Sequence, residues 1–239
     1  MSSDHRRLCI LQAVRSLFSK KGLRVTSKEL SCAAGVSEAL IYKLFSSKEG
    51  LYAALLEHSC NAHEPLGQEL AEHPPSTEVL ACAVYLLIHI KFHGLPDCPD
   101  NMSLNPDEVR GLLLQSFQKD GEFARTIFNK GLGPWVSAIT QSMETSIKAG
   151  EMTPPSEVSL ETLVWLIHHS ALGVKMTLHP KPDAYMGPKL SEDEQLMTLF
   201  KFLLRGAGVS EEALTRVIKS NEFKNFKTKL KPYTKEKEA

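Results

Sequence analysis

Residues 37–43 carry side chains that can hydrogen-bond to the edges of nucleic-acid bases. Lys43 can donate to guanine O6 and N7 or to a phosphate, and Glu38 can accept from cytosine N4. Ala39 can contact a thymine methyl group. Ser37 and Tyr42 complete the set of polar or small residues near the start of one short helix. For Glu38 the alternative is that the carboxylate points into solvent.

Two further residues are placed to hold a phosphate. Thr26 and Lys48 both lie at predicted helix N-termini, where free backbone N–H groups and the helix dipole favour an anion. Such contacts fix the register of a protein on DNA rather than its choice of sequence. The alternative for Thr26 is helix capping alone, and the two roles are compatible.

Short helices must position these side chains. Apolar residues three and four apart predict an amphipathic helix over 5–21, which Gly22 ends. The segment 26–29 reads as a capping box that opens a second helix, and Gly35 permits a tight turn before a third helix capped by Ser37. A second capping box at 46–49 opens a fourth helix. A helix, a glycine-containing turn and another helix form a helix-turn-helix pattern, whose second helix enters the major groove.

The N-terminal region resembles the DNA-binding domain of TetR/AcrR-type transcriptional regulators. The resemblance covers about 50 residues and rests on Leu17-Phe18, Gly22, Thr26, Ala33-Ala34-Gly35-Val36-Ser37, Ile41-Tyr42, Phe45 and Lys48-Glu49-Gly50-Leu51. Many members of that family have glycine where this chain has Ala39. The resemblance implies that Tyr42 bonds a backbone phosphate. It also implies a homodimer that binds a palindromic operator on double-stranded DNA.

The remainder of the chain also reads as helical. Periodic apolar residues and clear caps predict helices over 76–93, 106–118, 121–149, 157–178, 192–206 and 211–219, and no strand-like alternation of useful length appears. The predicted fold is therefore all-α. We expect a helix-turn-helix DNA-binding domain over 3–62, a helical regulatory and dimerisation domain over 63–220, and a frayed Lys-rich tail over 221–239.

Charge is unevenly distributed along the 239 residues, although 28 basic and 28 acidic side chains give no net charge. Residues 1–60 carry +4, residues 61–218 carry −8 and residues 219–239 carry +4. A cationic N-terminal segment suits a polyanionic partner. No stretch reaches the ~20 apolar residues of a membrane helix, and no export signal is visible. We expect a cytoplasmic protein without a membrane partner.

Dimerisation is assigned to the helices near 157–178 and 192–206. The first is apolar on more than one face and contains Ala171 and Gly173, which permit close helix approach; the second contributes Leu199, Phe200 and Leu203. By analogy with the family, these helices would form a four-helix bundle with their symmetry mates. Packing within a single chain is the alternative.

A small-molecule effector would need an apolar pocket with a few polar groups. The candidate lining residues are His89, Phe92, Phe117, Trp135, Met143, Trp165 and His169. Their aromatic character suggests an apolar or aromatic effector, and ordinary core packing is the alternative for each of them. Neither the His89 and His93 pair nor the histidines flanking Cys60 have a matching second cluster, so we predict no metal site and no cofactor.

These observations predict a ligand-responsive dimeric regulator of transcription, specifically a repressor that a small molecule releases from its operator. An all-helical enzyme is the second hypothesis. The sequence has no phosphate loop, no GxSxG and no HExxH motif, so we predict no enzymatic activity. The third hypothesis is a helical protein-interaction module that has lost DNA binding, for which Ala39 is the one indication.

Overall fold

The computed structural model describes residues 3–61, 70–94, 106–118, 121–177 and 190–230. Helices make up most of these ranges and are joined by turns and short irregular segments, with one isolated β-bridge between Met152 and Val209. The all-α prediction is therefore confirmed. The chain divides into two compact units, one formed by residues 1–64 and 97–132 and the other by residues 65–96 and 133–239. None of the described helices combines the length and apolar character needed to cross a membrane.

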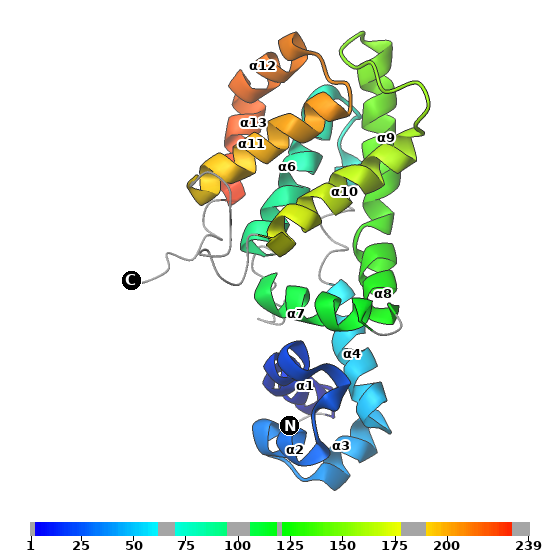
Figure 1. Cartoon of the computed structure of the whole chain (residues 1–239), viewed down its shortest axis with the longest axis vertical. Coiled ribbons are helices and arrows are strands. Elements are labelled where there is room, and N and C mark those ends of the chain that lie inside the picture. Colours follow the sequence, from blue (N-terminus) through cyan, green and yellow to red (C-terminus); the bar gives the residue numbers. More distant parts are fainter. Residues whose placement is uncertain (1–2, 62–69, 95–105, 119–120, 178–189, 231–239) are drawn as a thin grey trace. The chain divides into compact units, whose positions relative to one another are not determined.

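The first unit contains the short N-terminal helices and two helices from later in the chain (Figure 1). Its elements are α1 (Ser3–Lys21), η1 (Gly22–Arg24), α2 (Ser27–Ala34), α3 (Glu38–Phe45), α4 (Lys48–Asn61), α7 (Pro106–Phe117) and α8 (Glu122–Gly131). Helix α7 packs against α1, and α8 packs against α4. The backbone of α1 approaches α7 so closely that a Cβ on Gly111 would lie 2.4 Å from the carbonyl oxygen of Ser19. Only glycine fits there.

The second unit is built around α6 (Thr77–His93). Its other helices are α9 (Gly133–Lys148), α10 (Leu160–Thr177), α11 (Glu192–Gly206), α12 (Glu211–Lys219) and α13 (Asn221–Leu230). Fourteen side chains of α6 are buried, because α9, α10, α11, α12 and α13 all contact it (Figure 1). The sequence run from Val79 to Ile90 is thus the centre of this unit, and a helix apolar on all sides is expected to be buried in this way.

Two predicted elements differ from the observed ones. The helix predicted over 121–149 divides at Leu132 into α8 and α9, where the sequence reads Gly131-Leu132-Gly133-Pro134. Glycine is a weak helix former, and proline removes a backbone donor, so the local sequence accounts for the break. The segment from 221, predicted to be frayed, is helical over Asn221–Leu230.

Helix α13 is ordered because it contributes to the core. The Phe223 ring is 1% exposed, stacks on Phe200 with centroids 5.2 Å apart, and meets the edge of Tyr85 at 5.4 Å. Burial of one aromatic side chain stabilises a short helix that would be marginal in isolation. Residues 231–239 of the predicted tail lie outside the described part of the chain.

Candidate functional site

The start of α2 is fixed by the capping box that the sequence predicts. The Thr26 backbone N–H donates to Glu29 Oε2 at 2.9 Å, and the Glu29 backbone N–H donates to Thr26 Oγ1 at 3.2 Å. The Lys21 ammonium bonded to Glu29, together with the hydrogen bonds from Thr26, lowers the pKa of that carboxyl to about 2. The cap therefore stays ionised at neutral pH, and Thr26 has the capping role that we weighed against phosphate binding.

The turn between α2 and α3 depends on Gly35. This residue has φ of +62°, a left-handed conformation that glycine adopts without steric cost, and its N–H bonds back to Cys32 O at 3.3 Å. Ser37 then caps α3, because its hydroxyl accepts from the Leu40 N–H at 3.2 Å. The second helix of the motif thus begins where the sequence places it.

Helix α3 has a buried face and an exposed face. Ile41 and Phe45 are buried, at 3% and 5% exposure. The exposed face carries all five residues predicted to face the bases, which are Ser37, Glu38, Ala39, Tyr42 and Lys43. A single surface of one short helix therefore presents a hydroxyl, a carboxylate, a methyl group, a phenol and an ammonium, and this is the size of element that the major groove admits.

Tyr42 connects this surface to the N-terminus of α2. Its hydroxyl hydrogen-bonds to the Ser27 hydroxyl in the first turn of that helix. The first backbone N–H groups of a helix lack intrahelical partners and carry partial positive charge. The phenol therefore lies beside a group of donors suited to one phosphate oxygen.

Lys48 faces the protein backbone. Its ammonium donates to the carbonyl oxygen of Leu23 at 2.6 Å and to that of Val25 at 3.3 Å, both in the segment that precedes α2. The side chain is half-buried. It ties the start of α4 to this segment, a role that a helix-terminus argument from sequence does not reveal.

Arg7 is a further residue of this region that sequence reasoning missed. Its guanidinium donates to the Leu44 carbonyl oxygen and lies over the Phe45 ring at 4.4 Å from the centroid. It therefore fixes the C-terminal end of α3 against α1. The sequence separation of 37 residues leaves no local signal for this contact.

The predicted pocket residues are divided between the two units. His89, Phe92, Trp135, Met143, Trp165 and His169 belong to the second unit, whereas Phe117 is in α7 of the first. Phe117, the last residue of α7, is 54% exposed, and His169 is exposed on α10. These two side chains are therefore not core residues, and their role in lining a pocket stays a prediction.

His89 and Trp135 combine deep burial with unused polar atoms. They are 3% and 1% exposed, and within the described part of the chain neither nitrogen of His89 nor Trp135 Nε1 has a hydrogen-bond partner. Burial, with the neighbouring His93, lowers the pKa of His89 to about 4, so its ring is neutral at pH 7. Buried polar groups are nearly always hydrogen-bonded, and each exception calls for an explanation.

His89 and Trp135 lie at similar heights along α6 and α9, but the helix turns His89 about 120° away from the α6 face on which Thr77 contacts Ser146. Thr77 Oγ1 at the start of α6 donates to Ser146 Oγ near the end of α9 at 2.8 Å, and Figure 1 shows the two helices running in opposite directions. At ~1.5 Å per residue, His89 is ~18 Å along α6 from this contact. By the same rise Trp135 is ~17 Å back along α9.

The predicted dimer residues are largely used inside one chain. Ala171, Leu199, Phe200 and Leu203 are between 0% and 8% exposed, because these faces of α10 and α11 pack within the second unit. Packing within one chain, the alternative to an interface, describes these four residues, and their place in a dimer interface stays a prediction. Gly173 is exposed on α10 and stays a prediction.

The exposed faces of the same two helices carry different apolar side chains. Leu166 of α10 is 51% exposed and Phe202 of α11 is 67% exposed. Both helices pack on α6 (Figure 1), so the two side chains belong to one unit. The sequence did not show that these two side chains are exposed, because its pattern does not distinguish them from the other apolar residues of the same helices.

Comparison with known proteins identifies the N-terminal helices. Residues 10–55 match the family described as bacterial regulatory proteins, tetR family. A segment of 61 residues is 48% identical to the uncharacterized HTH-type transcriptional regulator YvkB of Bacillus subtilis (strain 168). That segment is 25% of this chain and spans about a third (32%) of the YvkB chain.

Solved structures resemble the chain over most of its length. A bacterial regulatory protein of the tetR family from Rhodococcus RHA1 superposes with a TM-score of 0.61 at 17% identity, covering 86% of this chain and 98% of that one. The transcriptional regulator FadR from Bacillus subtilis, solved in complex with stearoyl-CoA, gives 0.59 at 16% identity, covering 83% and 97%. At this level of identity the likeness shows the fold. The family match identifies residues 10–55 as an N-terminal helix-turn-helix domain of the tetR family.

Proposed function

We propose that this protein is a dimeric repressor that binds a palindromic DNA operator through α3 and is released from it by a small molecule. The observation that carries the proposal is the exposed face of α3, with its five groups suited to base and phosphate contacts. Phosphate contacts make such binding steeply dependent on salt.

Selection of bound sequences from a random DNA pool tests this proposal. The expected result is a palindromic consensus that the intact protein enriches and that Tyr42→Ala does not, because the variant loses the phenol beside the α2 N-terminus. Leu114→Ala, a change at an exposed residue of α7, serves as the matched control and should enrich the same consensus. Enrichment of no sequence at low salt by the intact protein would contradict the proposal.

The effector is proposed to bind next to His89 and Trp135. Their unused donors suit an apolar molecule that carries a carbonyl or carboxylate oxygen, since indole Nε1 can only donate. Leaving such groups unpaired is costly, so a ligand that satisfies them gains affinity. FadR, solved with stearoyl-CoA, supports a small-molecule ligand for a chain of this fold.

Tryptophan fluorescence can test this site directly. The chain has two tryptophans, so Trp165→Phe leaves Trp135 as the sole reporter. A compound that releases operator DNA should shift Trp135 emission, and His89→Leu should weaken its binding by about ten-fold because one hydrogen bond is lost. A releasing compound whose affinity is unchanged in His89→Leu would place the effector elsewhere.

The dimer is proposed to form through the exposed faces of α10 and α11. Leu166 and Phe202 supply exposed apolar surface of the kind that interface cores bury. Sedimentation of a Leu166→Glu, Phe202→Glu double variant should give the 26.5 kDa monomer, whereas Leu114→Glu, at an exposed apolar residue of the first unit, should leave the dimer intact. A double variant that sediments as a dimer would refute this interface.

A further inference from the structure

The first unit contains a cleft that the DNA-binding surface does not use. It lies where α4 and the segment at Gly22 and Leu23 face the end of α7 and the start of α8, and it encloses about 670 Å³. Pockets for small organic ligands have volumes of ~300–1,000 Å³. The cleft shares no lining residue with the exposed face of α3 or with His89 and Trp135.

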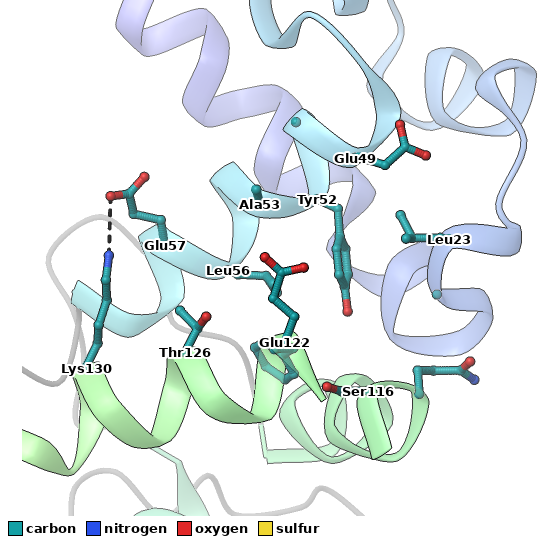
Figure 2. A pocket seen from close by; sticks show the side chains of 14 residues that line it. Leu23, Glu49, Tyr52, Ala53, Leu56, Glu57, Ser116, Glu122, Thr126 and Lys130 are labelled. Carbon is teal, nitrogen blue, oxygen red and sulfur yellow. Dashed lines mark hydrogen bonds and ion pairs between the residues drawn. The ribbon is translucent and has the colours of Figure 1, made fainter. Parts of the chain in front are cut away.

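The base of the cleft is apolar and fixed. Leu56 and Phe123 are 6% and 1% exposed, and Leu23 adds a further aliphatic side chain. The Tyr52 ring projects into the space from α4 (Figure 2) and is held against the buried Phe18, with ring centroids 5.1 Å apart. An aromatic ring held in this way offers a rigid surface for a ligand.

The charge of the cleft is negative. Its charged lining residues are three carboxylates, Glu49, Glu57 and Glu122, and one ammonium, Lys130. Lys130 pairs with Glu57 at 3.4 Å, as Figure 2 shows, so this ammonium is directed at one of the three carboxylates. Glu49 has no ion-pair partner within the described residues. The cleft thus complements a positive charge, not an anion.

We propose that this cleft binds an organic cation that has an apolar body. The cationic group lies between Glu49 and Glu122 and within reach of the Tyr52 ring, whose negative π-face attracts a cation. The apolar body rests on Leu56 and Phe123. Because apolar contact and opposite charge act together, neither a small inorganic cation nor an apolar anion of the same shape satisfies the site.

Tetraphenylphosphonium and tetraphenylborate are a suitable pair of probes, since they match in shape and differ in the sign of the charge. Calorimetric titration of the full chain in sodium buffer should show saturable binding of the phosphonium and at least about ten-fold weaker binding of the borate. Equal affinity for the two ions, or no phosphonium binding at 1 mM, would overturn the proposal.

Variants of the lining carboxylates test whether the phosphonium binds in the cleft. Glu49→Gln and Glu122→Gln should each weaken phosphonium binding about two- to five-fold, as expected for exposed charge pairs, and the double variant about ten-fold. Glu192→Gln is the matched control, because Glu192 is also an exposed carboxylate in the first turn of a helix. Unchanged affinity in the double variant would place the cation outside the cleft and refute the assignment.

Glu49 and Glu122 also stabilise the first turns of α4 and α8 through the helix dipole. Thermal unfolding therefore accompanies each titration. If the double variant does not fold, Tyr52→Leu keeps the packing on Phe18 but removes the π-face, and a loss of about three-fold or more in phosphonium affinity is then expected. An unaltered affinity in Tyr52→Leu would refute the placement of the cation beside the ring.

Discussion

Replacing Lys48 by methionine tests whether its ammonium stabilises the fold or binds a DNA phosphate. In the structure it donates to the carbonyl oxygens of Leu23 and Val25, at 2.6 and 3.3 Å. Methionine keeps the apolar stem and removes the charge, so two carbonyl oxygens lose their donor. The segment that leads into α2 is then less firmly attached to α4.

The expected magnitude follows from these two contacts. A hydrogen bond from a charged group contributes about 1.5–3 kcal/mol when buried, and a partner left unsatisfied costs about 1–3 kcal/mol. Lys48 is half-buried and water can replace part of the loss, so we expect Lys48→Met to lower the free energy of unfolding by about 2 kcal/mol. For a chain of this size, that corresponds to a fall of roughly 4–8 °C in Tm.

Urea unfolding followed by circular dichroism measures the first effect, and DNA affinity as a function of salt measures the second. A phosphate contact contributes about 0.9 to the slope of log K against log salt. Lys48→Met should leave that slope unchanged. Lys43→Met, at the exposed lysine of α3, should lower the slope or relax sequence choice and change stability by less than about 0.5 kcal/mol.

The reverse pattern would refute the reasoning. If Lys48→Met unfolds at the same urea concentration as the intact protein and loses about one unit of salt slope, the ammonium leaves the carbonyls and binds phosphate. The phosphate role inferred from the helix N-terminus would then be the correct one.

Three further predictions concern single side chains. Tyr42→Phe removes the hydroxyl beside the α2 N-terminus and should weaken operator binding about three- to ten-fold in a gel-shift titration, with an unchanged Tm; full affinity would exclude a role for the hydroxyl. Phe223→Ala should cost about 3–5 kcal/mol in urea unfolding, more than Phe226→Ala, because Phe223 is fully buried and Phe226 only half-buried. Burial lowers the pKa of His89 from 6.5 to about 4, so between these pH values the unfolded chain binds a proton that the folded chain does not. The free energy of unfolding should therefore fall by up to about 3 kcal/mol as the pH drops from 7 to 4. In His89→Leu this dependence on pH should be weaker.

The local signals of helix ends could be predicted from sequence because each depends on four consecutive residues. Thr26 with Glu29 and Ser191 with Glu194 both form the reciprocal hydrogen bonds of a capping box. The turn at Gly35 follows in the same way from one residue type. The turn at Gly35 fixes where α3 begins, and hence which of its side chains are exposed.

Contacts between distant segments gave no comparable signal. The order of α13 depends on Phe223 meeting Phe200 and Tyr85, and nothing in a Lys-rich segment indicates that its one buried phenylalanine finds two aromatic partners. The acidic cleft likewise brings together residues 22–57 and 115–130, whose helices are predictable one by one. Which of these helices pack against each other could not be predicted, because several helices have similar apolar faces and the periodic pattern does not distinguish between them.

The dimer residues show the same ambiguity within a single helix. Leu199, Phe200 and Leu203 of α11 are as apolar as Phe202, and a sequence pattern does not say which stripe faces α6. In the structure the first three are buried in the second unit, whereas Phe202 is 67% exposed. Association can bury an exposed phenylalanine and so lower the free energy, whereas a phenylalanine that is already buried in the core gains nothing further. A strongly apolar position in the sequence therefore does not by itself indicate an interface, because the core of the same chain can bury it.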